Sequence, residues 1–174
     1  MGDVTDRAQE AARASARSRL PRISRVLAPT DFSELANHAV GYAYALLPGG
    51  GTVHLLHAVE EARLPNPLYA HYTPGRRPTA EERAAQRRDL EAALRALVPE
   101  EAGARGIETR LEIVEGEDPV RAILAAAERL GVDVTCMGTH GRSGLSALVA
   151  GCVACEVASQ SSRPLFLVRP PKGE

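Results

Sequence analysis

The segment Val132-Asp133-Val134-Thr135-Cys136-Met137-Gly138-Thr139-His140-Gly141, followed nine residues later by Gly151-Cys152, decides the fold of this chain. Its first six residues form an apolar run typical of a strand, and a helical pattern begins at Val153. A glycine-rich turn between a strand and a helix is where α/β proteins hold phosphate groups. Glycine lets the backbone approach the ligand closely, and the free N–H groups of the helix start point at the anion. The segment therefore predicts a nucleotide-phosphate site late in the chain.

The rest of the chain alternates strand-like and helical patterns. The strand-like runs are 23–28, 53–59, 107–114, 132–137 and 164–168. Ser33, Thr79 and Asp118 precede the first three helical patterns as expected N-caps, and Glu82 completes a capping box with Thr79. This alternation predicts an α/β protein with one open, five-stranded, mostly parallel sheet and helices on both faces.

Length and composition favour a single globular domain. The chain has 174 residues, of which 44% are hydrophobic and 25% charged, and its net charge of −1 gives no general attraction to nucleic acid or to an anionic membrane. No apolar run approaches the length of a membrane span, and no secretory signal is visible. Three cysteines do not suggest a secreted disulfide framework. We expect a cytoplasmic domain over 22–170, flanked by polar tails at 1–21 and 171–174.

The turn after the first strand is the second candidate for ligand binding. Ligands of parallel sheets bind beyond the carboxyl ends of the strands, where the strand order reverses. If the first and fourth strands are neighbours there, Pro29-Thr30-Asp31 meets the turn that begins at Gly138. Asp31 could instead only cap the turn and the next helix, and the glycines could serve only tight packing. Four glycines at 138, 141, 144 and 151 exceed the needs of a tight turn, which favours phosphate binding.

Several enzyme motifs are missing from the sequence. There is no Gly-x-Ser-x-Gly elbow, no Gly-x-x-x-x-Gly-Lys-Ser/Thr loop, and no early Gly-x-Gly-x-x-Gly. His54 and His57 lie an odd number of strand positions apart, so they should face opposite sides and share no metal. We interpret His140 as a polar loop residue, whereas Arg142 could clamp a phosphate.

Cys152-Val153-Ala154-Cys155 forms a Cys-x-x-Cys sequence at a predicted helix start. Such a thiol can have a lowered pKa and take part in redox exchange. A structural zinc would need two more ligands. We favour the simpler interpretation that both cysteines are small, half-buried residues facing the sheet, and we keep redox sensing as an alternative.

Three separate segments give the chain a family resemblance. They are Val26-Leu27-Ala28-Pro29-Thr30-Asp31-Phe32-Ser33, then Leu55-Leu56-His57-Ala58-Val59, then Met137-Gly138-Thr139-His140-Gly141-Arg142-Ser143-Gly144-Leu145 with Gly151. In this order and spacing they resemble the universal stress proteins, from about Ser24 to Arg169. The resemblance implies the strand order 3-2-1-4-5, a homodimer through the last strand and, in one branch of the family, bound ATP.

The resemblance also implies roles for single residues. Asp31 would hold ribose hydroxyls, while Ala58 and Met137 would line an adenine pocket. Residue 152 would add a hydroxyl, but this chain has Cys152 where that branch carries Ser or Thr, and a thiol is a weaker hydrogen-bonding group. The backbone of Gly138, Gly141, Gly151 and Val153 would face the phosphates. Pro29, Thr30 and Arg142 complete the predicted binding set.

We therefore predict a regulatory stress-response protein that binds an adenine nucleotide as a dimer. The nucleotide would be ATP, or AMP or ADP, accompanied by Mg²⁺ or Mn²⁺, and the partner of the signalling surface would be an unknown protein. Any ATP hydrolysis should be slow, because no general base is evident near the loop. One alternative is a dimeric interaction module that binds no nucleotide, and another is a thiol redox protein that uses Cys152 and Cys155.

Overall fold

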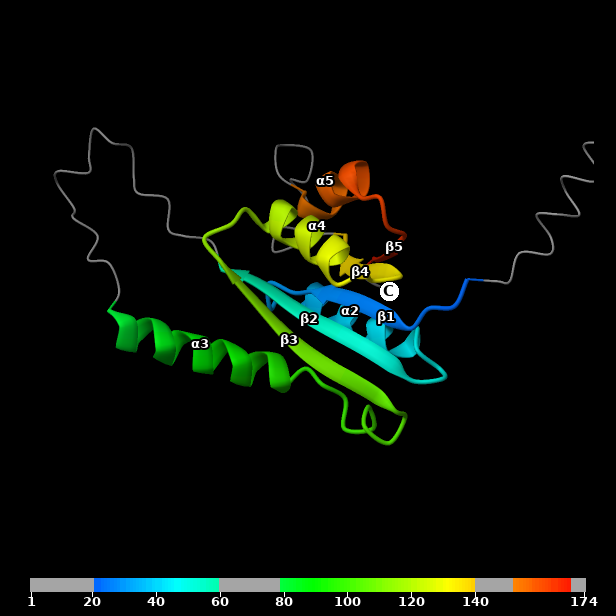
Figure 1. The fold of residues 1–174 in the computed structure, drawn as a ribbon, viewed down its shortest axis with the longest axis horizontal. Coiled ribbons are helices and arrows are strands. Elements are labelled where there is room, and N and C mark those ends of the chain that lie inside the picture. Colours follow the sequence, from blue (N-terminus) through cyan, green and yellow to red (C-terminus); the bar gives the residue numbers. More distant parts are fainter. Residues whose placement is uncertain (1–20, 60–78, 140–151, 170–174) are drawn as a thin grey trace, which may run out of the picture.

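The fold is a parallel sheet between helices, seen in a computed structural model that describes residues 21–59, 79–139 and 152–169 (Figure 1). The strands are β1 (Arg25–Pro29), β2 (Gly51–Val59), β3 (Ile107–Glu115), β4 (Val134–Gly138) and β5 (Leu165–Val168). The helices are α2 (Glu34–Ala45), α3 (Ala80–Arg95), α4 (Pro119–Arg129) and α5 (Val153–Gln160). The strand order is β3-β2-β1-β4-β5 and every pairing is parallel, which confirms the predicted architecture.

The two faces of the sheet carry separate hydrophobic cores. Residues of β1, β2 and β4 that point one way pack with α2 and α3 around Tyr44 and Leu94, both of which are almost fully buried. Residues that point the other way pack with α4 and α5 around Ile123 and Val157. Figure 1 shows α4 and α5 on the near side, α2 behind the sheet, and α3 along β3. Strand alternation thus gives each face its own apolar set, as expected for a sheet covered on both sides.

The helix starts agree with the predicted caps. The Ser33 hydroxyl accepts a hydrogen bond from the backbone N–H of Ala36, and Asp118 accepts two from the first turn of α4. Thr79 and Glu82 form the reciprocal capping box, with Thr79 N–H donating to the Glu82 carboxylate at 2.7 Å. These side chains satisfy backbone donors that have no partner within the helix, so they fix where each helix begins.

Two strands, β1 and β4, begin two residues later than the sequence pattern predicted. β1 starts at Arg25 and not at Ile23, whose side chain is exposed, and β4 starts at Val134 and not at Val132. The reason is Asp133, whose carboxylate accepts hydrogen bonds from the backbone N–H groups of Ser24 and Arg25 and from the Ser24 hydroxyl. Burial raises the pKa of Asp133, but these hydrogen bonds outweigh burial and leave it below its usual value. Asp133 thereby joins the starts of β1 and β4.

In the described ranges no helix combines the length and the apolar character that crossing a bilayer would require.

Candidate functional site

The carboxyl ends of β1 and β4 lie side by side at one edge of the sheet. Val26 pairs with Val134 and Leu27 with Thr135, and both strands run in the same direction. The chain turns to one side of β1 for β2 and β3 and to the other side for β4 and β5, so the strand order reverses at this point. The turns that follow Pro29 and Gly138 therefore leave the sheet at the same edge, which is where parallel sheets bind ligands.

Thr30 organises the turn between β1 and α2. Its side chain is buried, donates a hydrogen bond to Asn37 Oδ1 at 2.9 Å and accepts one from the backbone N–H of Phe32 at 2.9 Å. Its own N–H donates to the carbonyl of Leu56 on β2. Pro29 is buried at the end of β1, so neither Pro29 nor Thr30 presents its side chain to solvent. The hydrogen bonds of Thr30 fix the turn.

Asp31 is the exposed residue of this turn. One of its carboxylate oxygens accepts a hydrogen bond from the backbone N–H of Ser33 at 2.9 Å. The next residue, Phe32, has a φ of 61°, a left-handed backbone conformation that residues other than glycine rarely adopt. This strained backbone turns the chain sharply and leaves the Asp31 carboxylate at the surface with one oxygen engaged. Both the structural role and the ligand role considered for Asp31 are compatible with this geometry.

His57 supports the turn from β2. Its Nδ1 atom lies 2.9 Å from the carbonyl oxygen of Thr30, and its ring packs against Phe32 in a tilted arrangement with centroids 4.6 Å apart. His54 lies on the opposite face of the same strand beside Glu112, so the predicted separation of the two histidines is confirmed. The sequence analysis did not place His57 or Asn37 at this edge, because their contacts depend on how β2 and α2 dock beside β1.

Gly138 allows the end of β4 and the start of α2 to lie close together. A Cβ atom at this position would lie 2.9 Å from Leu35 Cγ and 3.3 Å from the Leu35 carbonyl oxygen. Leu35 sits at the second position of α2, four residues after Asp31. The absence of a side chain at Gly138 therefore lets the end of β4 approach the start of α2.

Cys152 is the N-cap of α5 and connects this helix to the end of β4. Its sulfur accepts a hydrogen bond from the backbone N–H of Cys155 at 3.3 Å, and its thiol donates to the carbonyl of Thr139 at 3.5 Å. The backbone N–H of Thr139 in turn donates to Val168 on β5. Val153 begins the helix and is half-buried. The start of α5 is thus anchored to the segment that directly follows Gly138.

Met137 and Ala58 face the α4/α5 side of the sheet. Met137 is buried in the core of that face, and Ala58 packs against the same core from the end of β2. Both are on the same side of the sheet, as an adenine pocket would require. Gly141, Arg142 and Gly151, together with His140, lie outside the described residues.

One interpretation of the Cys-x-x-Cys sequence is wrong. Cys152 is half-buried as expected, but Cys155 is exposed and does not face the sheet. Ala154 and Val157 provide the inward-facing side chains of α5, and the helical repeat therefore places Cys155 on the outer side. The spacing of these two apolar residues was the signal in the sequence that could have shown this.

Comparison with known proteins agrees with this geometry. Residues 22–169 match the sequence model of the Universal stress protein family. The chain belongs to this family. A curated relative, Universal stress protein MJ0531 of Methanocaldococcus jannaschii, is 35% identical over 69 residues, which are 40% of this chain and 40% of that protein's length.

Solved universal stress protein structures share the fold. The structure described as a structure-based assignment of the biochemical function of hypothetical protein MJ0577 is 25% identical with a TM-score of 0.68, and the match covers 88% of this chain and 100% of that one. A universal stress protein in complex with cAMP is 21% identical with a TM-score of 0.60, and the match covers 86% of this chain and 98% of that one. The second likeness concerns the fold alone.

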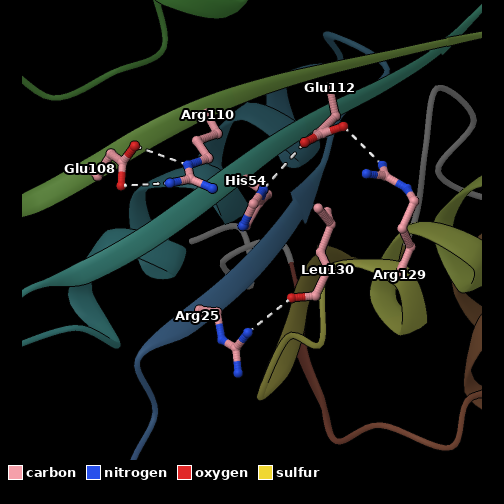
Figure 2. A network of polar contacts seen from close by, with 7 residues as sticks. All are labelled: Arg25, His54, Glu108, Arg110, Glu112, Arg129 and Leu130. Carbon is pink, nitrogen blue, oxygen red and sulfur yellow. Dashed lines mark hydrogen bonds and ion pairs between the residues drawn. The ribbon is translucent and has the colours of Figure 1, made fainter.

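A polar network on the α4 side of this universal stress protein fold was missed by sequence reasoning (Figure 2). His54 is buried on β2, with Nδ1 3.4 Å from a Glu112 oxygen, and Arg129 of α4 lies 2.9 Å from the other oxygen. Among the described residues, His54 Nδ1 has no hydrogen-bond partner, so its contact with Glu112 lacks hydrogen-bond geometry. Burial lowers the pKa of His54, although Glu112 raises it. Glu108 and Arg110 pair next to it on β3. These partners depend on strand register, which the sequence pattern did not specify.

Proposed function

We propose that this chain binds an adenine nucleotide, ATP or AMP or ADP, at the edge where β1 and β4 end, and acts in the cytoplasm as a regulatory stress-response protein. The observation that supports this most strongly is that the carboxyl ends of β1 and β4 lie side by side, with Gly138 at the end of β4 close against Leu35 at the start of α2. Three free cysteines in the described ranges agree with a reducing compartment.

Each part of this edge offers a contact that suits a nucleotide. Asp31 is exposed, and a carboxylate oxygen is a good acceptor for ribose hydroxyl groups. The start of α5 offers backbone N–H groups and the positive end of a helix dipole to a phosphate. The fold match to a universal stress protein in complex with cAMP supports a ligand that carries adenine, ribose and phosphate.

A divalent cation would accompany the phosphates of ATP rather than occupy a site built by the protein. Within the described ranges, no group of three or more histidine, cysteine or acidic side chains is arranged to hold a metal ion. Mg²⁺ keeps several waters and commonly binds through substrate phosphates, so such a site needs few protein ligands. The proposed Mg²⁺ or Mn²⁺ therefore depends on which nucleotide is bound.

Nucleotide occupancy would regulate the protein by shifting the segment between β4 and α5. A ligand shifts a conformational equilibrium only if it binds one state more tightly. Cys152 links the start of α5 to Thr139, so contacts with a phosphate would act on both sides of this segment. The resulting change would be read by a partner protein.

The direct test is the ligand that the protein carries and the ligand that stabilises it. Mass spectrometry of small molecules released from freshly purified full-length protein should detect an adenine nucleotide. Added ATP with Mg²⁺ at 100 times its Kd should stabilise the fold by about 2.7 kcal/mol. For a domain of this size that raises Tm by roughly 5 to 10 °C.

Asp31→Asn tests the site itself, because the variant keeps the oxygen that accepts the Ser33 N–H but loses the negative charge. It should weaken nucleotide binding roughly tenfold, the loss expected for a charged hydrogen bond of about 1.5 kcal/mol. Asp89→Asn, an exposed substitution on α3, should leave affinity unchanged. No released nucleotide and no thermal shift at millimolar ATP would favour the alternative of an interaction module without nucleotide.

The homodimer is proposed through β5. This strand is an edge of the sheet, and Phe166 and Leu167 are exposed on it. Phe166 lies 5.9 Å from the exposed Tyr42 ring of α2, measured between centroids, so an apolar surface continues from the strand onto the helix. An exposed apolar edge strand is suited to pairing with a second copy. Light scattering should give twice the chain mass for the native protein and the monomer mass for Phe166→Lys, and a monomeric native protein would contradict the proposal.

A further inference from the structure

The two cysteines at the start of α5 are placed to react with each other. Cys152 is the N-cap and Cys155 is the third residue of the helix, so the two side chains project from neighbouring positions of one turn. The Cys152 sulfur lies 3.3 Å from the backbone nitrogen of Cys155. A disulfide needs Cβ atoms about 3.5 to 4.5 Å apart, whereas side chains three positions apart on a helix have Cβ atoms about 5 to 6 Å apart, so the two cysteines must approach each other by about 1 to 2 Å.

These thiols differ from the third cysteine in their access to solvent. Cys155 is exposed and Cys152 is half-buried, so a small oxidant can reach the pair. Cys136 is buried in the core, its thiol donates to the carbonyl of Ala39, and burial raises its pKa to about 12. Buried thiols of this kind react poorly, because the thiolate is the reactive form. The chain therefore contains an accessible pair and an internal control.

Cys152 also affects the pKa of Cys155. A hydrogen bond with the Cys152 side chain is the largest cause that raises the pKa of Cys155, and burial, the charge of Cys152 and the charge of Glu156 add to it. Cys155 is thus held as a protonated thiol next to the Cys152 sulfur. In a dithiol pair one sulfur, as the thiolate, attacks an external disulfide, and the neighbouring sulfur then resolves the mixed disulfide.

We propose that Cys152 and Cys155 form a reversible dithiol–disulfide pair, oxidised by a low-molecular-mass disulfide such as glutathione disulfide. One cysteine attacks the external disulfide, breaking its S–S bond and releasing one small thiol. The second cysteine then attacks the mixed disulfide and releases the other small thiol, as the protein S–S bond forms. The two cysteines lose two electrons and two protons, and the external disulfide gains them.

The consequence falls on the segment that follows β4. A disulfide sulfur carries no hydrogen, so oxidation removes the hydrogen bond that Cys152 donates to the Thr139 carbonyl. It also ties the N-cap to the first turn of α5. If the protein binds a nucleotide as proposed, this change should lower its affinity. We expect oxidation to weaken nucleotide binding roughly threefold to tenfold, the effect of losing one hydrogen bond.

The test uses the full-length chain in glutathione buffers of increasing oxidation, followed by acid quenching, maleimide labelling and intact mass analysis. The native protein should lose two labelled thiols together and two hydrogens in mass, in a single two-electron transition, and peptide mapping should find the bond between residues 152 and 155. Cys136→Ser should behave like the native protein. Cys152→Ser and Cys155→Ser should each stop at a mixed disulfide with glutathione.

Three results would overturn the proposal: a stable glutathione adduct on the native protein, a disulfide between two chains in place of one within the chain, or unreacted thiols in excess glutathione disulfide. Nucleotide titration of the fully reduced protein separates this inference from the proposed function. If the reduced protein binds no nucleotide but forms the internal disulfide, the proposed function fails and the dithiol pair stands. If the reduced protein binds nucleotide but forms no internal disulfide on oxidation, the proposed function stands and the dithiol pair fails.

Discussion

The turn between β1 and α2 and the start of α5 lie beside the same edge of the sheet, but different chemistry holds them. The first is fixed by oxygen and nitrogen groups, with Thr30, Asn37 and His57 making hydrogen bonds of 2.9 to 3.2 Å. The second is fixed by the sulfur of Cys152 at 3.3 and 3.5 Å. Sulfur is a weaker donor and acceptor than oxygen. Under the proposed function, the β1–α2 turn would be the more rigid half that orients the nucleotide, and the start of α5 would be the weaker-held half that responds to it.

The largest expected effect comes from Thr30→Val. The variant keeps the shape of the side chain but leaves Asn37 Oδ1 and the Phe32 N–H without their partner. Losing two partly buried partners should destabilise the fold by about 2 to 4 kcal/mol, measured by urea unfolding. Cys152→Ala, the matched change in the softer half, should cost less than about 1 kcal/mol. Equal losses of unfolding free energy in the two variants would contradict the view that the β1–α2 turn is held more firmly than the start of α5.

The close approach of β4 to α2 is tested by Gly138→Ala. The new methyl group would meet Leu35 at 2.9 Å, so the end of β4 must move away from α2. We expect a loss of about 1 to 3 kcal/mol in unfolding free energy. Gly41→Ala is the control within α2, because a Cβ there meets nothing within 4 Å. Alanine in place of a helical glycine should stabilise by about 0.5 to 1 kcal/mol, and a neutral Gly138→Ala would show that the close approach is unimportant.

Acid sensitivity should arise away from both halves, at His54. Burial holds the folded-state pKa of His54 below the ordinary value of 6.5, so the unfolded chain takes up the proton first as the pH falls. This group therefore leaves stability unaffected well above pH 6.5 and lowers it below that pH. His54→Asn should flatten the fall in Tm between pH 7.5 and 5, and Glu112→Gln should steepen it, because Glu112 favours the charged ring. Identical pH profiles in all three proteins would contradict this assignment.

The smallest expected effect on stability is that of Cys152→Ser. A hydroxyl is a better N-cap than a thiol, so α5 should gain a few tenths of a kcal/mol. The same hydroxyl should tighten ATP binding by up to about tenfold, because it offers a phosphate a stronger hydrogen bond. Calorimetric titration of both reduced proteins measures this difference. Weaker binding by the serine variant would show that the thiol itself is part of the ligand contact.

The sequence predicted those features that depend on local pattern. Alternating strands and helices indicated the parallel sheet, and the caps at Ser33, Thr79 and Asp118 marked the helix starts, because each cap needs only its own first turn. The neighbourhood of β1 and β4 came from the family resemblance. It could not have come from periodicity, which does not specify strand order.

Features that depend on docking between distant segments were not predictable in the same way. The partner of His57 lies 27 residues earlier, at Thr30, and the network around His54 depends on the register of β2 with β3. Asp133 was read as part of a strand because its hydrogen bonds to Ser24 and Arg25 span more than a hundred residues. Cys155 was misplaced for a local reason, since the repeat of Ala154 and Val157 already indicated the inner side of α5.

The most direct test of the central claim is a map of backbone amide shifts as ATP with Mg²⁺ is added to the reduced protein. We expect the largest changes at Asp31, at Gly138 and at the first residues of α5, with little change at the starts of β1 and β3. Saturable binding whose largest changes fall at those strand starts, or along the His54 network, would contradict a nucleotide site where β1 and β4 end.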